Sequence, residues 1–222
     1  MSRLVAVCLV LAMVSACYAN DSWSWEDGQL DGWSSCWGGP YVLIPAQYGN
    51  GSATDGTWSV GILPVAGQYW SVAYNGNANA AGATKMSFDV TIKLADGWSD
   101  DSWVNSDKLV LQNHTTWAWQ ELRDGQISIQ VLSGGSPGLP DNNGNTAYWN
   151  TGMGDITWRI TYDLSSMSPD SLINGAYSIY WALQYSGTTP GLVYVDNVQI
   201  TPEPATMALL GLGGLALIRR KR

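Results

Sequence analysis

The chain has few residues that could carry out acid–base or nucleophilic chemistry. His114 is the only histidine, and Cys36 is the only cysteine outside the first 19 residues. Glu26 and Glu121 are the only glutamates between residues 20 and 201. A sugar hydrolase needs two carboxylates facing each other across a cleft, and a cysteine nucleophile needs an activating base or helix start. No such arrangement stands out, so the sequence predicts a protein that is not an enzyme.

Aromatic residues are the other candidates for function, because the chain has 13 Trp and 11 Tyr but only one Phe. Such rings either pack the core of an all-β domain or form a platform on which sugar rings stack. The candidates for ligand binding are Trp98 and Trp103, which flank an acidic loop, Trp149, which ends an Asn-rich loop, and the pair Trp117 and Trp119. Residues two apart in a strand share a face, so Trp117 and Trp119 are the first choice for a platform. Packing under a loop is the alternative for each ring.

The elements that must hold these rings show the alternation typical of strands, with apolar residues at every second position. Clusters of Gly, Asn, Asp, Ser and Pro separate the strands, and residues 20–201 show no convincing helical period. We therefore expect an all-β fold, an antiparallel two-sheet β-sandwich of nine or ten strands. The strands are expected in the ranges 23–26, 41–44, 58–62, 69–74, 85–94, 108–112, 127–131, 156–163, 177–185 and 194–200.

Both edges of this domain resemble a known family. The segment Trp25-Glu26-Asp27-Gly28, followed by Asp31-Gly32-Trp33, resembles the opening of jelly-roll carbohydrate-binding modules. Residues 193–200 resemble the strand that closes those modules. The resemblance implies a jelly-roll sandwich and a role in binding polysaccharide, although the same fold serves many functions.

Asp196 is the candidate for a metal ligand. Period-two alternation places it on one face with Tyr194, Val198 and Ile200, and a carboxylate on an apolar face needs a partner. Calcium is a natural partner because it binds carboxylate and carbonyl oxygens. In the modules that the chain resembles, a structural calcium joins the first and last strands, which implies Glu26 and Asp196 as its ligands. The alternative is that Asp196 accepts bonds from backbone amides at a bulge.

The N-terminus reads as a secretory signal peptide covering residues 1–19, with Arg3, an apolar run and small residues before the expected signal peptidase cut after Ala19. Val14-Ser15-Ala16-Cys17 also resembles a bacterial lipobox, which would put a lipid on Cys17 instead.

The C-terminus combines Pro202-Glu203-Pro204, an uncharged run over 205–218 and the basic cluster 219–222. This order resembles the PEP-CTERM sorting signal, which implies export and processing by a membrane-bound exosortase. The run predicts a short hydrophobic transmembrane helix that holds the protein transiently in the membrane with its basic end in the cytoplasm. A plain membrane anchor is the alternative.

The chain thus divides into a signal peptide (1–19), a β-sandwich domain (20–201) and a sorting signal (202–222). The middle domain carries five Lys and Arg against seventeen Asp and Glu, a net charge of −12, which disfavours binding to nucleic acid. We expect a protein of the cell surface or extracellular matrix that binds polysaccharide. The alternatives are a purely structural matrix protein and, less favoured, a polysaccharide hydrolase or lyase.

Overall fold

The computed structural model describes residues 22–35, 42–47, 53–67, 70–79, 83–114, 116–122, 126–137, 147–167 and 176–202. The expected signal peptide, the C-terminal apolar run and Cys36 lie outside these ranges. The strands are β1 (Ser22–Trp23), β2 (Trp33–Ser35), β3 (Val42–Gln47), β4 (Trp58–Leu63), β5 (Trp70–Asn79), β6 (Ala83–Ile92), β7 (Trp103–Asn113), β8 (Trp119–Leu122), β9 (Ile127–Gly134), β10 (Ala147–Asn150), β11 (Ile156–Asp163), β12 (Ala176–Ser186) and β13 (Val193–Pro202). Two short 3-10 turns, η2 (Leu94–Asp96) and η3 (Thr151–Met153), follow β6 and β10.

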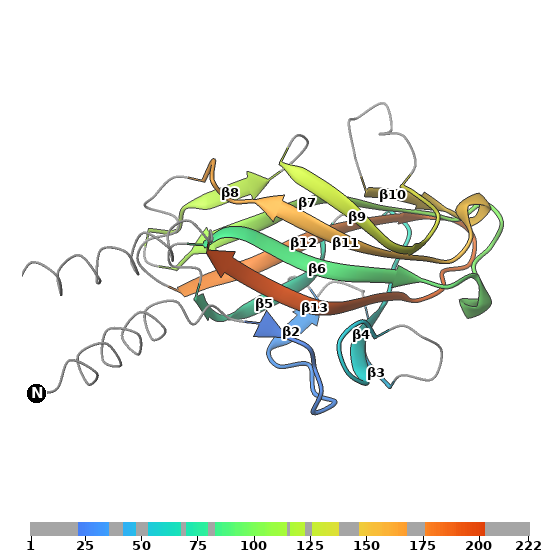
Figure 1. Ribbon diagram of the computed structural model, residues 1–222, viewed down its shortest axis with the longest axis horizontal. Helices are drawn as coiled ribbons and strands as arrows, with labels where there is room; N and C mark the ends of the chain where they lie inside the picture. The colour runs from blue at the N-terminus through green and yellow to red at the C-terminus, as the bar shows by residue number, and fades with distance from the viewer. Residues whose placement is uncertain are drawn as a thin grey trace, which may run out of the picture.

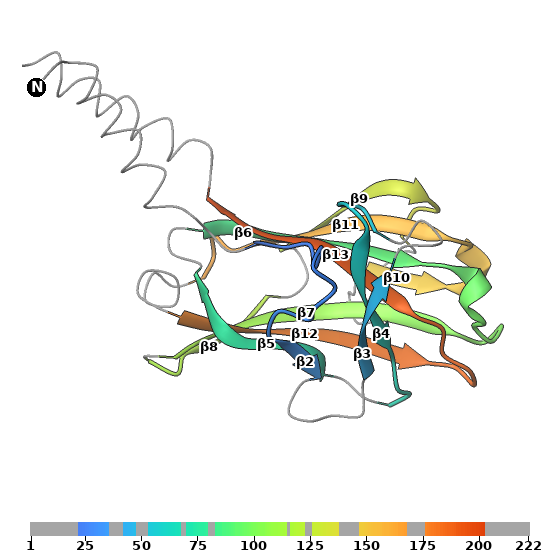
Figure 2. The same ribbon diagram turned by 90° about the horizontal axis from the view of Figure 1, so that it is seen from below.

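The described strands form two antiparallel sheets. Sheet A has the order β3-β4-β13-β6-β11-β9, with β1 also paired to β13. Sheet B has the order β10-β7-β12-β5-β2, with β8 also paired to β7. The chain passes from one sheet to the other between β5, β6 and β7 and again between β11, β12 and β13, which is the connectivity of a jelly roll (Figure 1). Figure 2 shows the two layers face to face, with β6, β11 and β13 in one and β5, β7 and β12 in the other. The expected all-β sandwich is confirmed.

The core lies between the sheets and is rich in aromatic rings. Alternate residues of β6, β11 and β12 point into it, as their period-two patterns predict. Phe88 on sheet A lies with its ring centroid 4.7 Å from that of Trp181 on sheet B. The Trp181 Nε1 donates a hydrogen bond to Ser106 Oγ at 2.5 Å, which satisfies the polar atom of a buried ring. Among the residues whose burial the structure describes, seven tryptophans lie in this core, and they are Trp23, Trp25, Trp33, Trp98, Trp149, Trp158 and Trp181.

A bulge in β13 changes which face the end of the strand presents. Asp196 pairs with Asp89 and Gln199 with Ser87, so β13 has one more residue than β6 over this stretch. Asn197, between them, has a left-handed φ of 49°. Because of this extra residue, Val198 lies in the core while Asp196 faces outward over sheet A. The expectation that Asp196 shares a face with Val198 and Ile200 was therefore wrong.

Candidate functional site

Trp119 lies on the outer face of sheet B. Leu109 and Leu111 of β7 point into the core, so Gln112 points outward. Trp119 is the partner of Gln112 across the β7–β8 pair, and residues directly opposite each other in an antiparallel pair share a face. The Trp119 side chain is 37% exposed.

The Trp119 ring is held in place by its neighbours. It stacks on the ring of Tyr180 from β12, with centroids 5.2 Å apart and planes 29° from parallel. Its Nε1 donates to Glu121 Oε1 at 3.2 Å, and the Tyr180 hydroxyl donates to Gln112 Oε1 at 3.0 Å. Glu121 also pairs with Lys108 at 3.2 Å. The ring is therefore fixed among polar side chains before any ligand arrives.

Trp117 precedes Trp119 by two residues and is the most exposed of the large apolar side chains in the described ranges, at 70%. It precedes β8 and has a left-handed φ of 57°, so alternation along a strand does not place it. Its ring centroid is 6.3 Å from that of His114, whose Nε2 is 2.6 Å from Ser178 Oγ. We call Trp117, Trp119 and Tyr180 the aromatic platform.

The other predicted rings lie at the opposite end of β7. Trp149 is 1% exposed, and its Nε1 donates to the Gly154 carbonyl at 2.8 Å. Trp98 is 8% exposed and lies with its centroid 5.1 Å from that of Trp149. Trp149 is thus part of the core and offers no face to a ligand, which corrects its place among the predicted ligand-binding residues. Burial of this kind depends on tertiary packing that its Asn-rich surroundings in the sequence did not reveal.

Trp103 is half-buried and lines an open groove of about 700 Å³ at this end of the sandwich. The groove also contacts Leu94, Trp98, Asp100, Asp101, Ser102, Tyr148, Asn150, Thr151 and Gly152. Of the five predicted tryptophans, Trp117 and Trp119 belong to the platform, Trp103 lines the groove and Trp149 lies in the core. Trp98 belongs to both the groove and the core.

Glu26 and Asp196 both bind the segment 54–58, from opposite ends. Asp196 Oδ2 accepts hydrogen bonds from the backbone N–H groups of Thr54 at 2.6 Å and Asp55 at 2.8 Å, and its Oδ1 accepts one from Asn197 at 2.7 Å. Glu26 Oε1 accepts from the N–H groups of Thr57 and Trp58 at 2.9 and 3.0 Å, and Oε2 accepts from Thr57. Burial raises the pKa of the Asp196 carboxyl, and the backbone donors act against that rise.

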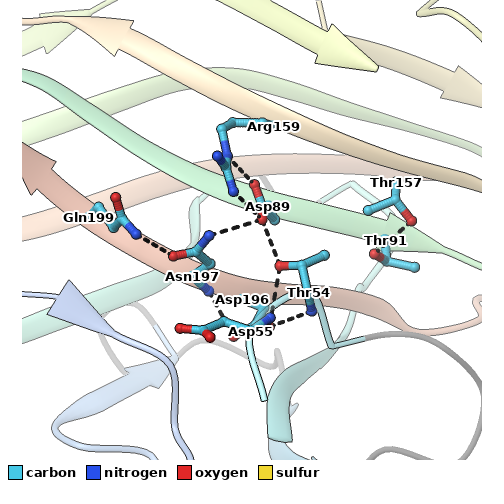
Figure 3. Close-up of polar contacts among 9 residues, drawn as sticks. All are labelled: Thr54, Asp55, Asp89, Thr91, Thr157, Arg159, Asp196, Asn197 and Gln199. Carbon is cyan, nitrogen blue, oxygen red and sulfur yellow. Dashed lines mark hydrogen bonds and ion pairs between the residues drawn. The ribbon is translucent and has the colours of Figure 1, made fainter. Parts of the chain in front are cut away.

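Asp89 contacts the same segment, and Arg159 pairs with Asp89. The sequence analysis predicted neither residue as part of this site. Arg159 Nε and Nη2 donate to the two carboxylate oxygens of Asp89 at 2.7 and 2.9 Å (Figure 3). The Thr54 hydroxyl donates to Asp89 Oδ2 at 2.6 Å and thereby links it to the segment that Asp196 holds. The hydrogen bonds from Arg159 to Asp89 raise the pKa of the guanidinium further. The only signal in the sequence was a pair of opposite charges on the polar faces of two strands.

These contacts bear on the predicted calcium ion. Each carboxylate oxygen of Glu26 and Asp196 accepts at least one backbone N–H bond. The described residues contain no group of three or more His, Cys, Asp and Glu placed to hold a metal. The alternative of amide acceptance at a bulge describes the contacts of Asp196. The calcium site itself stays a prediction.

Pro202 ends β13 and pairs with Ala83, while Glu203 and Pro204 lie outside the described ranges. Residues 201–222 match the PEP-CTERM protein-sorting motif. The PEP-CTERM motif implies an exported, cell-surface protein. Within the part of the chain that the structure describes, no helix is long and apolar enough to cross a bilayer. The helix predicted over 205–218 lies beyond that part.

No curated protein matches the sequence. Solved structures similar to this chain are carbohydrate-binding modules at low identity. One, studied for specific mannan recognition, has 9% identity and a TM-score of 0.45, covering 81% of this chain and 94% of its own. A module specific for non-crystalline cellulose has 14% identity and a TM-score of 0.46, with coverage of 80% and 90%. A xylan-binding domain from Paenibacillus barcinonensis has 12% identity and a TM-score of 0.46, with coverage of 84% and 98%.

Proposed function

We propose that this chain is a non-catalytic cell-surface protein that binds polysaccharide on the outer face of sheet B. The observation that carries the proposal is the exposure of Trp117 and Trp119, at 70% and 37%, two residues apart in the chain. A soluble domain gains nothing in folding from a large ring left in water, so an exposed pair of rings at one place on a surface favours a binding role.

The chemistry of the platform suits a sugar. The flat face of an indole stacks against the C–H face of a pyranose, and the stack of Trp119 on Tyr180 fixes that face in advance. A ring that is already ordered loses little conformational entropy on binding. Gln112, Glu121 and Lys108 lie around the stack and supply both donors and acceptors for sugar hydroxyls.

The sorting motif supports a proposed route to the surface. An exosortase processes the chain near Pro202–Pro204 after a signal peptidase has removed residues 1–19, and the apolar run 205–218 holds the protein in the membrane until then. The processed domain is retained in the polysaccharide matrix by its own binding. Its negative charge suits a neutral polymer better than an acidic one.

A purely structural matrix protein is the second candidate. The hydrogen bond from Trp119 to Glu121 and the stack on Tyr180 favour it, because they also explain Trp119 as a packing residue. They leave the exposure of Trp117 unexplained.

Migration through native gels that contain a neutral polysaccharide distinguishes the two candidates. We expect retardation of the wild-type chain by at least one polymer among mannan, xylan and soluble cellulose derivatives, and loss of that retardation in Trp117→Ala. Leu132→Ala is the control, because Leu132 is another exposed large apolar residue (39%) and lies on sheet A, away from the platform. Unretarded wild-type protein on every polymer would support the structural candidate.

A further inference from the structure

The groove at the far end of β7 is distinct from the aromatic platform. Trp103 is the first residue of β7, whereas Gln112, beside the platform, is next to its last. The groove volume of about 700 Å³ lies within the range of small-molecule sites, about 300–1,000 Å³. Its walls come from the loop after η2, the start of β7, and β10 with η3, and these have no part in the platform.

Two aromatic rings among the residues that line the groove lie close together. Tyr148 and Trp103 are both half-buried, with ring centroids 6.2 Å apart and planes tilted by 35°. Their strands are paired, with Asn150 opposite Trp103 in the register. The Asn150 Nδ2 donates to the Tyr148 hydroxyl at 3.5 Å, a long bond that leaves this hydroxyl available to a ligand.

Two carboxylates, from Asp100 and Asp101, also line the groove. The Asp101 carboxylate accepts bonds from the Thr188 N–H at 3.2 Å and hydroxyl at 3.0 Å, which fixes it. Asp100 is exposed, and its carboxylate has no hydrogen bond or ion pair within the described ranges. The Thr151 hydroxyl binds the Asp100 backbone carbonyl at 2.9 Å and so holds this residue at the groove.

The groove contains no compensating positive charge. Two carboxylates line it, and none of its lining residues is Lys or Arg. An ammonium group would be attracted to these carboxylates, and an anionic ligand would be repelled by them.

We propose that this groove is a second ligand site, specific for a protonated amino sugar, with the sugar ring against Trp103 and Tyr148 and the ammonium beside Asp100. It recognises amine-bearing units of a polysaccharide, which the platform on sheet B does not select. The two sites together let one domain contact a polymer at both ends of sheet B.

Isothermal titration of the full chain with glucosamine oligomers and their N-acetylated counterparts tests the proposal. Acetylation removes the charge and leaves the ring, so the two probes isolate the ammonium. We expect the free-amine oligomer to bind at least about fivefold more tightly, and added salt to reduce this preference. Asp100→Asn should reduce the preference for the free-amine oligomer to within about twofold. Trp103→Leu should weaken the binding of both oligomers.

Asp31→Asn is the matched control, because it removes one negative charge from an exposed turn between β1 and β2 and should leave the preference intact. Equal binding of the two oligomers, or binding of calcium alone, would overturn the proposal. Trp117→Ala separates this test from that of the platform, since it should abolish retardation by neutral polysaccharide and leave the glucosamine oligomer bound.

Discussion

The guanidinium of Arg159 on β11 holds the carboxylate of Asp89 on β6 through two hydrogen bonds of 2.7 and 2.9 Å. Asp89 is 1% exposed and lies directly opposite Asp196 on the next strand, so two carboxylates face the same covered region of sheet A. Arg159 supplies the positive charge that offsets the repulsion between these two carboxylates. The remaining donors to the two carboxylates come from Thr54, Asp55 and Asn197.

Removing Arg159 should therefore destabilise the fold strongly. Arg159→Met keeps the length of the side chain and leaves Asp89 buried without its partner, which costs about 3 kcal/mol in the free energy of unfolding. Urea unfolding followed by tryptophan fluorescence measures the loss. The double variant Asp89→Asn/Arg159→Met should recover much of it, and a loss below about 1 kcal/mol in the single variant would contradict the role given to the pair.

A substitution at Gly56 tests how tightly Glu26 binds the segment 54–58. It has a φ of 68°, and a Cβ there would lie 2.2 Å from the Glu26 carboxylate. Gly56→Ala should therefore lower the free energy of unfolding by more than the roughly 1 kcal/mol expected from backbone strain alone. Gly67→Ala provides that reference, because Gly67 has a φ of 76° with nothing near the position of the new Cβ. Equal losses in the two variants would mean that Glu26 does not hold the segment tightly.

Chelation tests whether amides or calcium bind the carboxylates of Glu26 and Asp196. The N–H bonds to both residues predict that the melting temperature is the same in calcium and in chelator. A calcium ion at 100 times its dissociation constant would instead add about 2.7 kcal/mol to the free energy of unfolding. A fall in melting temperature on chelation that disappears in Asp196→Ala would establish the calcium site and contradict the amide-bound arrangement.

Tyr194 gives the fold a measurable dependence on alkaline pH. Burial, with the nearby Asp96 carboxylate, raises the pKa of Tyr194 to about 12, against an ordinary value near 10. The raised pKa means that the stability contributed by the neutral phenol is fully present below about pH 10 and is lost as pH rises through 12. Burial also raises the pKa of Tyr177, so an ultraviolet titration should show more than one late-ionising tyrosine, of which the one that moves to lower pH in Asp96→Asn is Tyr194. Ionisation of Tyr194 at its ordinary pKa would contradict the burial assigned to it.

Alternation in the sequence predicted the core faces of β6, β11 and β12 because each strand buries one face and keeps regular pairing. It failed at β13, where Asn197 in a left-handed conformation shifts Val198 to the other face of the strand. No residue type marks such a bulge, since Asn adopts both conformations. The same limit applies to Trp117, whose left-handed φ takes it out of the expected strand.

The candidate site was predictable only in part. Exposed rings next to polar residues drew attention to Trp117 and Trp119, but their support by Tyr180 depends on the pairing of β7 with both β8 and β12. The contact between Asp89 and Arg159 likewise depends on the register between β6 and β11. Register between distant strands follows from tertiary packing, so a single sequence shows the members of such pairs but not their pairing.

Oxidative footprinting of tryptophan side chains, with and without a retarding neutral polysaccharide, tests the central claim most directly. Among the described tryptophans, Trp117 should react most in the free protein and Trp119 next, and the polysaccharide should protect both, while Trp103 stays as reactive as before. Unchanged reactivity of Trp117 and Trp119 with the polymer bound would contradict glycan binding on the outer face of sheet B.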